Sequence, residues 1–75
     1  MAREPLELAH MRFLVRLGLV RELRIGAGLT LLEVARDVGV TPSCVHYWER
    51  GQNPRGEPAV KYARLLIELE ILAGR

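Results

Sequence analysis

The sequence is poor in the features that mark secreted, membrane and disulfide-bonded proteins. Cys44 is its single cysteine, so no internal disulfide can form, and this favours a reducing, cytoplasmic setting. No uninterrupted apolar run is long enough to cross a bilayer. The apolar stretch over residues 6–20 is interrupted by His10, Arg12 and Arg16, and no small-residue cleavage site follows it. We therefore expect neither a signal peptide nor a membrane partner.

The residue patterns that carry catalysis are also missing. The sequence offers no Ser/His/Asp arrangement, no paired carboxylates, no cluster of metal ligands and no glycine-rich phosphate loop. His46 has no second ligand nearby and is more typical of a polar contact than of a metal site, and His10 is expected at the surface. The pattern thus predicts no enzyme, no cofactor, no bound metal and no small-molecule substrate.

What is present is the composition of a small folded protein. Hydrophobic residues make up 49% of the chain, and they recur at helical spacing without an alternating strand pattern. We expect residues 1–75 to form one all-α domain of four to five helices. A chain of 75 residues buries only a modest core, and a partner subunit often supplies the missing burial.

The positive charge is unevenly placed. The formal net charge is only +2, but residues 50–64 hold Arg50, Arg55, Lys61 and Arg64 against Glu57 alone. Such a patch suits a polyanion, although a solvated surface would have the same composition.

The first half of the chain predicts one long helix over about residues 6–25, with a kink possible at Gly18. Gly26 and Gly28 end this helix, as glycines past a helix end commonly do. Its inward residues are expected at steps of three and four, namely Leu6, Ala9, Phe13, Leu17, Val20 and Leu23.

Capping signals divide the second half. Thr30 and Glu33 fit a capping box, which starts a helix that runs to about Val38 and stops at Gly39. Thr41 caps a third helix, residues 42–50, with Pro42 in its first turn. Gly51 ends that helix, residues 52–56 form a turn-rich loop, and a last helix runs over about residues 58–73.

The two short helices carry the spacing of a helix-turn-helix. Two helices joined by a short turn cross closely, so a small residue is needed at the crossing, and Ala35 supplies it. Gly39 tolerates the positive φ of the turn, and Val45 returns an apolar side chain to the junction. Any helical hairpin of a small bundle remains the alternative. If Val45 and Trp48 point inward, the opposite face presents Ser43, His46, Tyr47 and Arg50, which can hydrogen-bond to base edges or phosphates.

The segment RELRIGAGLTLLEVARDVGVTPSCVHYWERGQNP resembles the lambda-repressor-like, Cro/cI-type helix-turn-helix domain. The resemblance rests on Leu23-Arg24, Gly28-Leu29-Thr30, Trp48-Glu49-Arg50-Gly51 and Asn53-Pro54. It covers about residues 20–66, leaving 1–19 as an N-terminal helical extension and 67–75 as the end of the last helix. Members are sequence-specific transcriptional regulators, often of phage origin, that bind operators as dimers. The resemblance implies a double-stranded DNA operator as partner and the bacterial host cytoplasm or nucleoid as location.

Carried over by position, the resemblance implies that helix 42–50 reads the major groove. Pro42, Ser43 and Tyr47 would lie nearest the bases, while Arg50 and the Asn53 to Arg55 loop would hold phosphates. Arg24 and Glu49 match an internal ion pair of the family. The full set of expected DNA contacts is Thr30, Thr41, Pro42, Ser43, His46, Tyr47, Arg50, Asn53 and Arg55. The chain departs from the family at Leu31, where a phosphate-contacting Gln is usual, and at Pro42, where a long polar base reader is common.

The last helix has two apolar rows. One consists of Ala59, Ala63, Leu66 and Ile67, and the other of Tyr62, Leu65, Leu69 and Leu72. One row can cover the core, and the second is expected to be a homodimer interface, unless the two terminal helices cover each other within one chain. A protein-interaction module on the same scaffold, such as an antitoxin or an assembly adaptor, is the alternative function.

Overall fold

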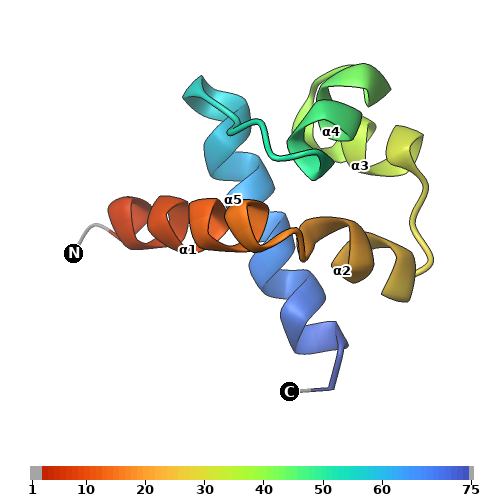
Figure 1. The fold of residues 1–75 in the computed structure, drawn as a ribbon, viewed down its shortest axis with the longest axis horizontal. Coiled ribbons are helices and arrows are strands. Elements are labelled where there is room, and N and C mark those ends of the chain that lie inside the picture. Colours follow the sequence, from red (N-terminus) through yellow and green to blue (C-terminus); the bar gives the residue numbers. More distant parts are fainter. Residues whose placement is uncertain (1–2, 75) are drawn as a thin grey trace.

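The computed structural model describes residues 3–74 and shows five α-helices. They are α1 (Glu4–Leu17), α2 (Val20–Gly26), α3 (Leu31–Val38), α4 (Pro42–Glu49) and α5 (Gly56–Leu72). No strand occurs in this part of the chain. Figure 1 shows α5 in the middle of the fold, with α1 crossing it and with α2, α3 and α4 gathered on its other side. The expected all-α fold of four to five helices is confirmed.

The first helical region is broken rather than kinked at Gly18. Gly18 takes a left-handed conformation with φ of 74°, which glycine adopts without steric cost. Its N–H donates to the carbonyl of Val15, and the Leu19 N–H donates to the carbonyl of Leu14, so two backbone hydrogen bonds close the end of α1. The prediction of one continuous helix over 6–25 was therefore wrong, and α2 starts in a new direction.

The inward face of α1 also differs from the prediction. Met11, Leu14 and Val15 are buried, whereas three of the residues expected to point inward are largely exposed: Leu6 (62%), Phe13 (48%) and Leu17 (51%). Ala9 is exposed as well. Two apolar rows interlace on this helix, and the break at Gly18 uncouples the register of α1 from that of α2. Beyond the break, Val20 is buried and Leu23 packs against the core as expected.

Helix α5 is buried on both of its apolar rows. Ala59, Ala63 and Leu66 belong to one row, Tyr62 and Leu69 to the other, and all five are core residues. The helix is central, because α1 covers one flank and α2 and α3 contact the rest. It begins at Gly56, two residues before the predicted start.

The two terminal helices cover each other within one chain. Besides apolar contacts, His10 Nε2 lies 2.6 Å from Glu70 Oε1, and Arg64 Nε donates to Glu7 Oε1 over 3.2 Å. The expected dimer interface is therefore corrected at two positions, since Tyr62 and Leu69 are sealed in the core at 2% and 4% exposure. Leu65 is half-buried, and only Leu72 of that set is freely exposed, at 73%.

The helices α3 and α4 follow their sequence signals closely, with the predicted caps at Thr30 and Thr41. The rings of Trp48 and Tyr62 join α4 to α5, with centroids 4.6 Å apart. No helix within residues 3–74 is both long and apolar enough to span a membrane.

Candidate nucleic-acid interface

The junction between α3 and α4 is as tight as the small residues predict. Ala35 is fully buried where the helices cross, and Val45 reaches the same junction with no exposed surface. Gly39 turns the chain with φ of 89°. The carbonyl of Ala35 accepts hydrogen bonds from the N–H groups of Gly39 and Val40, at 2.8 and 2.9 Å. The geometry is that of a helix-turn-helix.

Helix α4 packs against the core with one side and exposes the opposite side. Val45 and Trp48 are buried, and the polar residues expected opposite them, Ser43, His46, Tyr47 and Arg50, are all exposed. Tyr47 is 55% exposed, and its ring meets the ring of His46 edge-on at 5.7 Å between centroids. The two rings thus present hydrogen-bonding groups on an exposed surface, a chemistry that suits contacts with base edges.

The start of α4 is held by its cap. Thr41 Oγ1 accepts from the N–H of Cys44 at 3.4 Å, and Pro42 occupies the first turn, where no N–H is needed. Thr41, Pro42 and Ser43 are exposed, and Cys44 is half-buried. The amino-terminal end of this helix, which the resemblance places nearest the bases, is therefore accessible.

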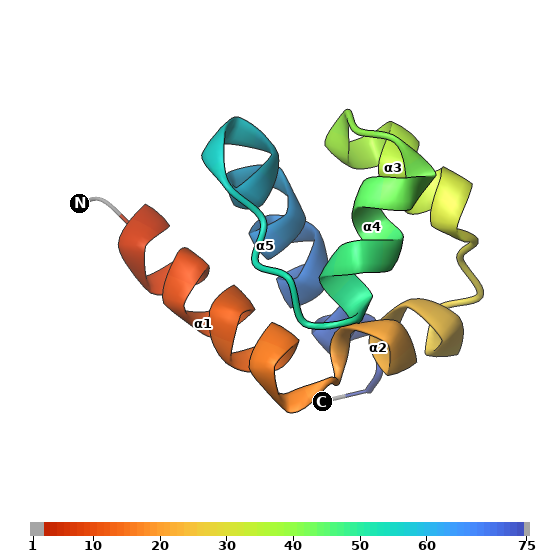
Figure 2. The same ribbon diagram turned by 45° about the horizontal axis from the view of Figure 1, so that its top comes forward.

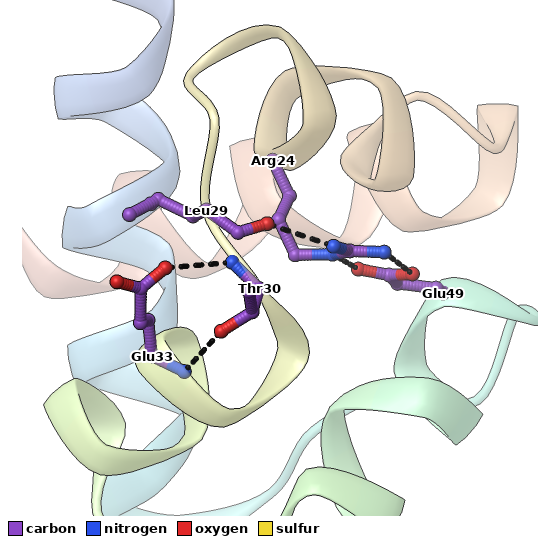
Figure 3. Close-up of polar contacts among 5 residues, drawn as sticks. All are labelled: Arg24, Leu29, Thr30, Glu33 and Glu49. Atoms are coloured by element: carbon purple, nitrogen blue, oxygen red, sulfur yellow. Dashed lines mark hydrogen bonds and ion pairs between the residues drawn. The ribbon is translucent and has the colours of Figure 1, made fainter.

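The start of α3 uses its polar side chains for capping. Thr30 Oγ1 accepts from the N–H of Glu33 at 3.1 Å, and Glu33 Oε1 accepts from the N–H of Thr30 at 2.9 Å (Figure 3). Leu31 follows, and its half-buried side chain packs against the core. Leu31 therefore makes an apolar contact with the core at the position where the resemblance implies a polar residue that contacts DNA.

A buried ion pair connects α2 to the end of α4. Arg24 Nε and Nη2 donate to the two carboxylate oxygens of Glu49 at 2.5 and 3.1 Å, and Arg24 Nη1 donates to the carbonyl of Leu29 at 2.8 Å (Figure 3). The side chains are only 13% and 5% exposed. The hydrogen bonding of Arg24 to the Glu49 carboxylate raises the pKa of Arg24 above its ordinary value, although burial opposes this effect. The pair that the resemblance implies is thus present, and it brings α4 and α2 into a fixed relation.

The segment after α4 forms a shallow polar cleft. Gln52, Asn53 and Arg55 line it together with Trp48. Pro54 is buried between these exposed residues, and the N–H of Gln52 donates to the carbonyl of Tyr47 at 3.1 Å. The structure therefore brings the expected Asn53 and Arg55 together beside the end of α4. It also adds Gln52, which sequence reasoning passed over although its amide lies directly before Asn53.

No group of three or more His, Cys, Asp or Glu side chains within residues 3–74 could hold a metal ion. The side chains gathered at α4 and the following loop are hydroxyls, an imidazole, a phenol, amides and guanidinium groups. Such a set binds anions and hydrogen-bonding edges.

Comparison with known proteins agrees with this geometry. The helix-turn-helix family model matches residues 20–68, which is more than half of the chain and includes α2, α3, α4 and most of α5. No curated protein and no solved structure matches the chain. The match begins at α2, so α1 lies outside it.

Proposed function

This chain belongs to the Cro/cI-type, lambda-repressor-like helix-turn-helix family, and we propose that it is a sequence-specific transcriptional regulator that reads operator DNA. The observation that carries this proposal is the exposed polar side of α4, held against the core by Val45 and Trp48. A helix presented in this way fits the major groove, and its amino-terminal residues meet the base edges. A Cro- or repressor-type role in a phage is the specific form that we propose.

The side chains divide into two proposed classes of contact. Ser43, Tyr47 and His46 contact bases, with Pro42 limited to an apolar contact because it has no N–H. Arg50, Asn53 and Arg55 bind phosphates at the end of α4. Thr30 and Thr41 contribute chiefly by capping their helices, because both hydroxyls already accept backbone hydrogen bonds.

The first experiment selects bound duplexes from a random pool and then compares variants on the selected sequence. Tyr47→Ala is expected to change the preference at one base-pair position, because it removes a base contact. Arg55→Ala is expected to weaken all sequences alike and to lower the salt slope by about 1. Arg36→Ala, which removes an exposed arginine of α3 outside the proposed contacts, is the control. Unchanged affinity and preference in both test variants would reject the proposed reading face.

We also propose that the protein binds as a homodimer, because symmetric pairing lets two copies read two half-sites. Of the predicted interface, Leu72 supports this proposal, since it is exposed at the end of α5 beside the exposed Ile71. Sedimentation at micromolar concentration is expected to show two 8.5 kDa chains bound to each duplex of operator DNA. A single 8.5 kDa protein species per selected duplex would contradict the homodimer.

The alternative function is a protein-interaction module, and one observation favours it. Leu6, Phe13 and Leu17 leave an apolar row on the outside of α1, and exposed apolar patches commonly mark protein contacts. Retention on heparin separates the two functions. DNA binding predicts retention that falls steeply with salt, and a module that binds only protein predicts weak retention with little salt dependence.

A further inference from the structure

Helix α1, which lies outside the family match, shares one side of the molecule with the candidate interface. Figure 2 shows α1 and α4 on either side of the connection between α4 and α5, with α5 behind that connection. A duplex placed against α4 and the following loop would therefore extend toward α1.

Two contacts fix the rotation of α1 about its axis. One edge of the helix faces the end of α5, because His10 bonds to Glu70. The other edge faces the start of α5, because half-buried Leu8 lines a cleft with Gly56 and Val60. Gly56 directly follows the loop that holds Asn53 and Arg55, so the Leu8 edge is the edge on the loop side.

Two arginines continue the Leu8 edge. Arg12 follows Leu8 by four residues, and Arg16 follows Arg12 by four, so they form one row that turns gradually away from the core. Both side chains are exposed. The guanidinium carbon of Arg16 lies 5.8 Å from the centre of the Phe13 ring, within the range of a cation–π contact.

No ion pair in the described part of the chain neutralises Arg12 or Arg16. Within residues 3–74, the ion pairs are His10–Glu70, Arg24–Glu49 and Arg64–Glu7. Arg12 and Arg16 take part in none, and no acidic residue lies three or four positions from either. Like charges four residues apart destabilise a helix slightly. The row therefore lowers the stability of α1 unless a polyanion lies against it.

We propose that Arg12 and Arg16 bind DNA phosphates beside the base pairs read by α4, so that α1 is a second, sequence-independent contact surface. This inference rests on the proposed function and extends it to a helix that the family match does not include. The phosphate row of a duplex suits the arginine pair because Arg12 and Arg16 lie about one helical turn apart on an exposed edge of α1. The contact adds affinity and salt dependence without changing which bases are preferred.

The test measures binding by fluorescence anisotropy on two duplexes that share the selected core. One carries flanking base pairs on both sides, and the other is trimmed to the core. On the long duplex at about 0.1 M salt, loss of each phosphate contact is expected to weaken binding about eightfold and to lower the salt slope by about 0.9. Arg12→Ala and Arg16→Ala are tested singly and together. Arg36→Ala is the control, because it also removes one exposed arginine but lies outside the proposed contacts.

A protein variant that keeps the positive charges and a duplex that lacks the flanking base pairs separate loss of a phosphate contact from a change in folding. The Arg12→Lys/Arg16→Lys double variant is expected to bind within about twofold of wild type, because lysine still binds phosphate. On the trimmed duplex, wild type and the double alanine variant are expected to bind equally. Circular dichroism is expected to show the same helix content in every variant.

The outcomes distinguish this proposal from the proposed function. If wild type selects a duplex but the double alanine variant matches Arg36→Ala in affinity and salt slope, the role of α1 is rejected and the reading face stands. An equal loss on the long and trimmed duplexes also rejects the flanking contact. If wild type selects no duplex at all, both proposals fall together, and an acidic protein partner becomes the better occupant of this row.

Discussion

Removing Arg24 should destabilise the protein more than any surface substitution, because it leaves Glu49 buried without a partner. In Arg24→Met, the Glu49 carboxylate loses both of its donors while it stays 5% exposed, and the carbonyl of Leu29 loses its donor as well. Breaking a buried ion pair from one side costs about 3–5 kcal/mol. A domain of 75 residues has a total stability of roughly 4–11 kcal/mol, so this variant should be close to unfolding.

Urea titration followed by Trp48 fluorescence can measure this loss. Trp48 is the only tryptophan and is 7% exposed in the fold, so unfolding changes its surroundings completely. The double variant Arg24→Met/Glu49→Leu should regain most of the lost stability, because an apolar pair can replace a buried ion pair at little net cost. The unpaired carbonyl of Leu29 should leave a deficit of about 1 kcal/mol. A loss below about 1 kcal/mol in Arg24→Met, or a double variant no more stable than it, would refute this reasoning.

Two further predictions concern the turn and the core. Gly39→Ala should lower the free energy of unfolding by about 1–2 kcal/mol, because the added Cβ meets no atom but φ of 89° strains any other residue. Gly26 also has open space around it but is helical, so Gly26→Ala should raise the free energy of unfolding by about 0.5–1 kcal/mol. Urea titrations in which both variants change the free energy of unfolding in the same direction would contradict this prediction. Burial raises the pKa of Tyr62 above its ordinary value of 10.0, and the Glu49 carboxylate adds to this while Arg24 opposes it. The stability that neutral Tyr62 contributes is therefore fully present below pH 10, and it falls by about 1.4 kcal/mol per pH unit as the pH rises above 10. The difference in the free energy of unfolding between wild type and Tyr62→Phe should accordingly be constant below pH 9 and fall above pH 10.

The parts of the structure that depend on local signals were predictable from the sequence. Ala35, Gly39 and Val45 determine the crossing of α3 and α4 within eleven residues of chain, and the caps at Thr30 and Thr41 mark where each helix starts. The ion pair between Arg24 and Glu49 links distant positions, and it was reached only through the family resemblance. The DNA contacts themselves stay a prediction, because their geometry depends on a partner.

The predictions that were wrong concern contacts between distant segments of the chain. On α1, the row of Leu6, Phe13 and Leu17 and the row of Met11, Leu14 and Val15 are equally apolar, so periodicity alone cannot tell which row faces the core. The choice is made by α5, which begins at Gly56, far along the chain from the end of α1 at Leu17. The same packing explains the burial of Tyr62 and Leu69. Because α5 is covered from two sides, both of its apolar rows are buried, whereas a surface helix buries only one row.

Helix α1 is a part of the core and not a loosely attached arm, and this bears on how its arginines could act. Met11, Leu14 and Val15 are 0%, 4% and 2% exposed, and burying three such side chains stabilises a fold by roughly 5–9 kcal/mol. That is comparable with the whole stability expected of a domain this small. The outward row of Arg12 and Arg16 is therefore held in place by the same packing that sets α4 against α5 through Trp48 and Tyr62. A basic arm that is disordered before binding must lose backbone freedom on DNA, whereas an arginine row on a packed helix has already lost its backbone freedom on folding. Phosphate contacts from α1 would for this reason cost the rotamer freedom of two exposed arginine side chains but little backbone entropy.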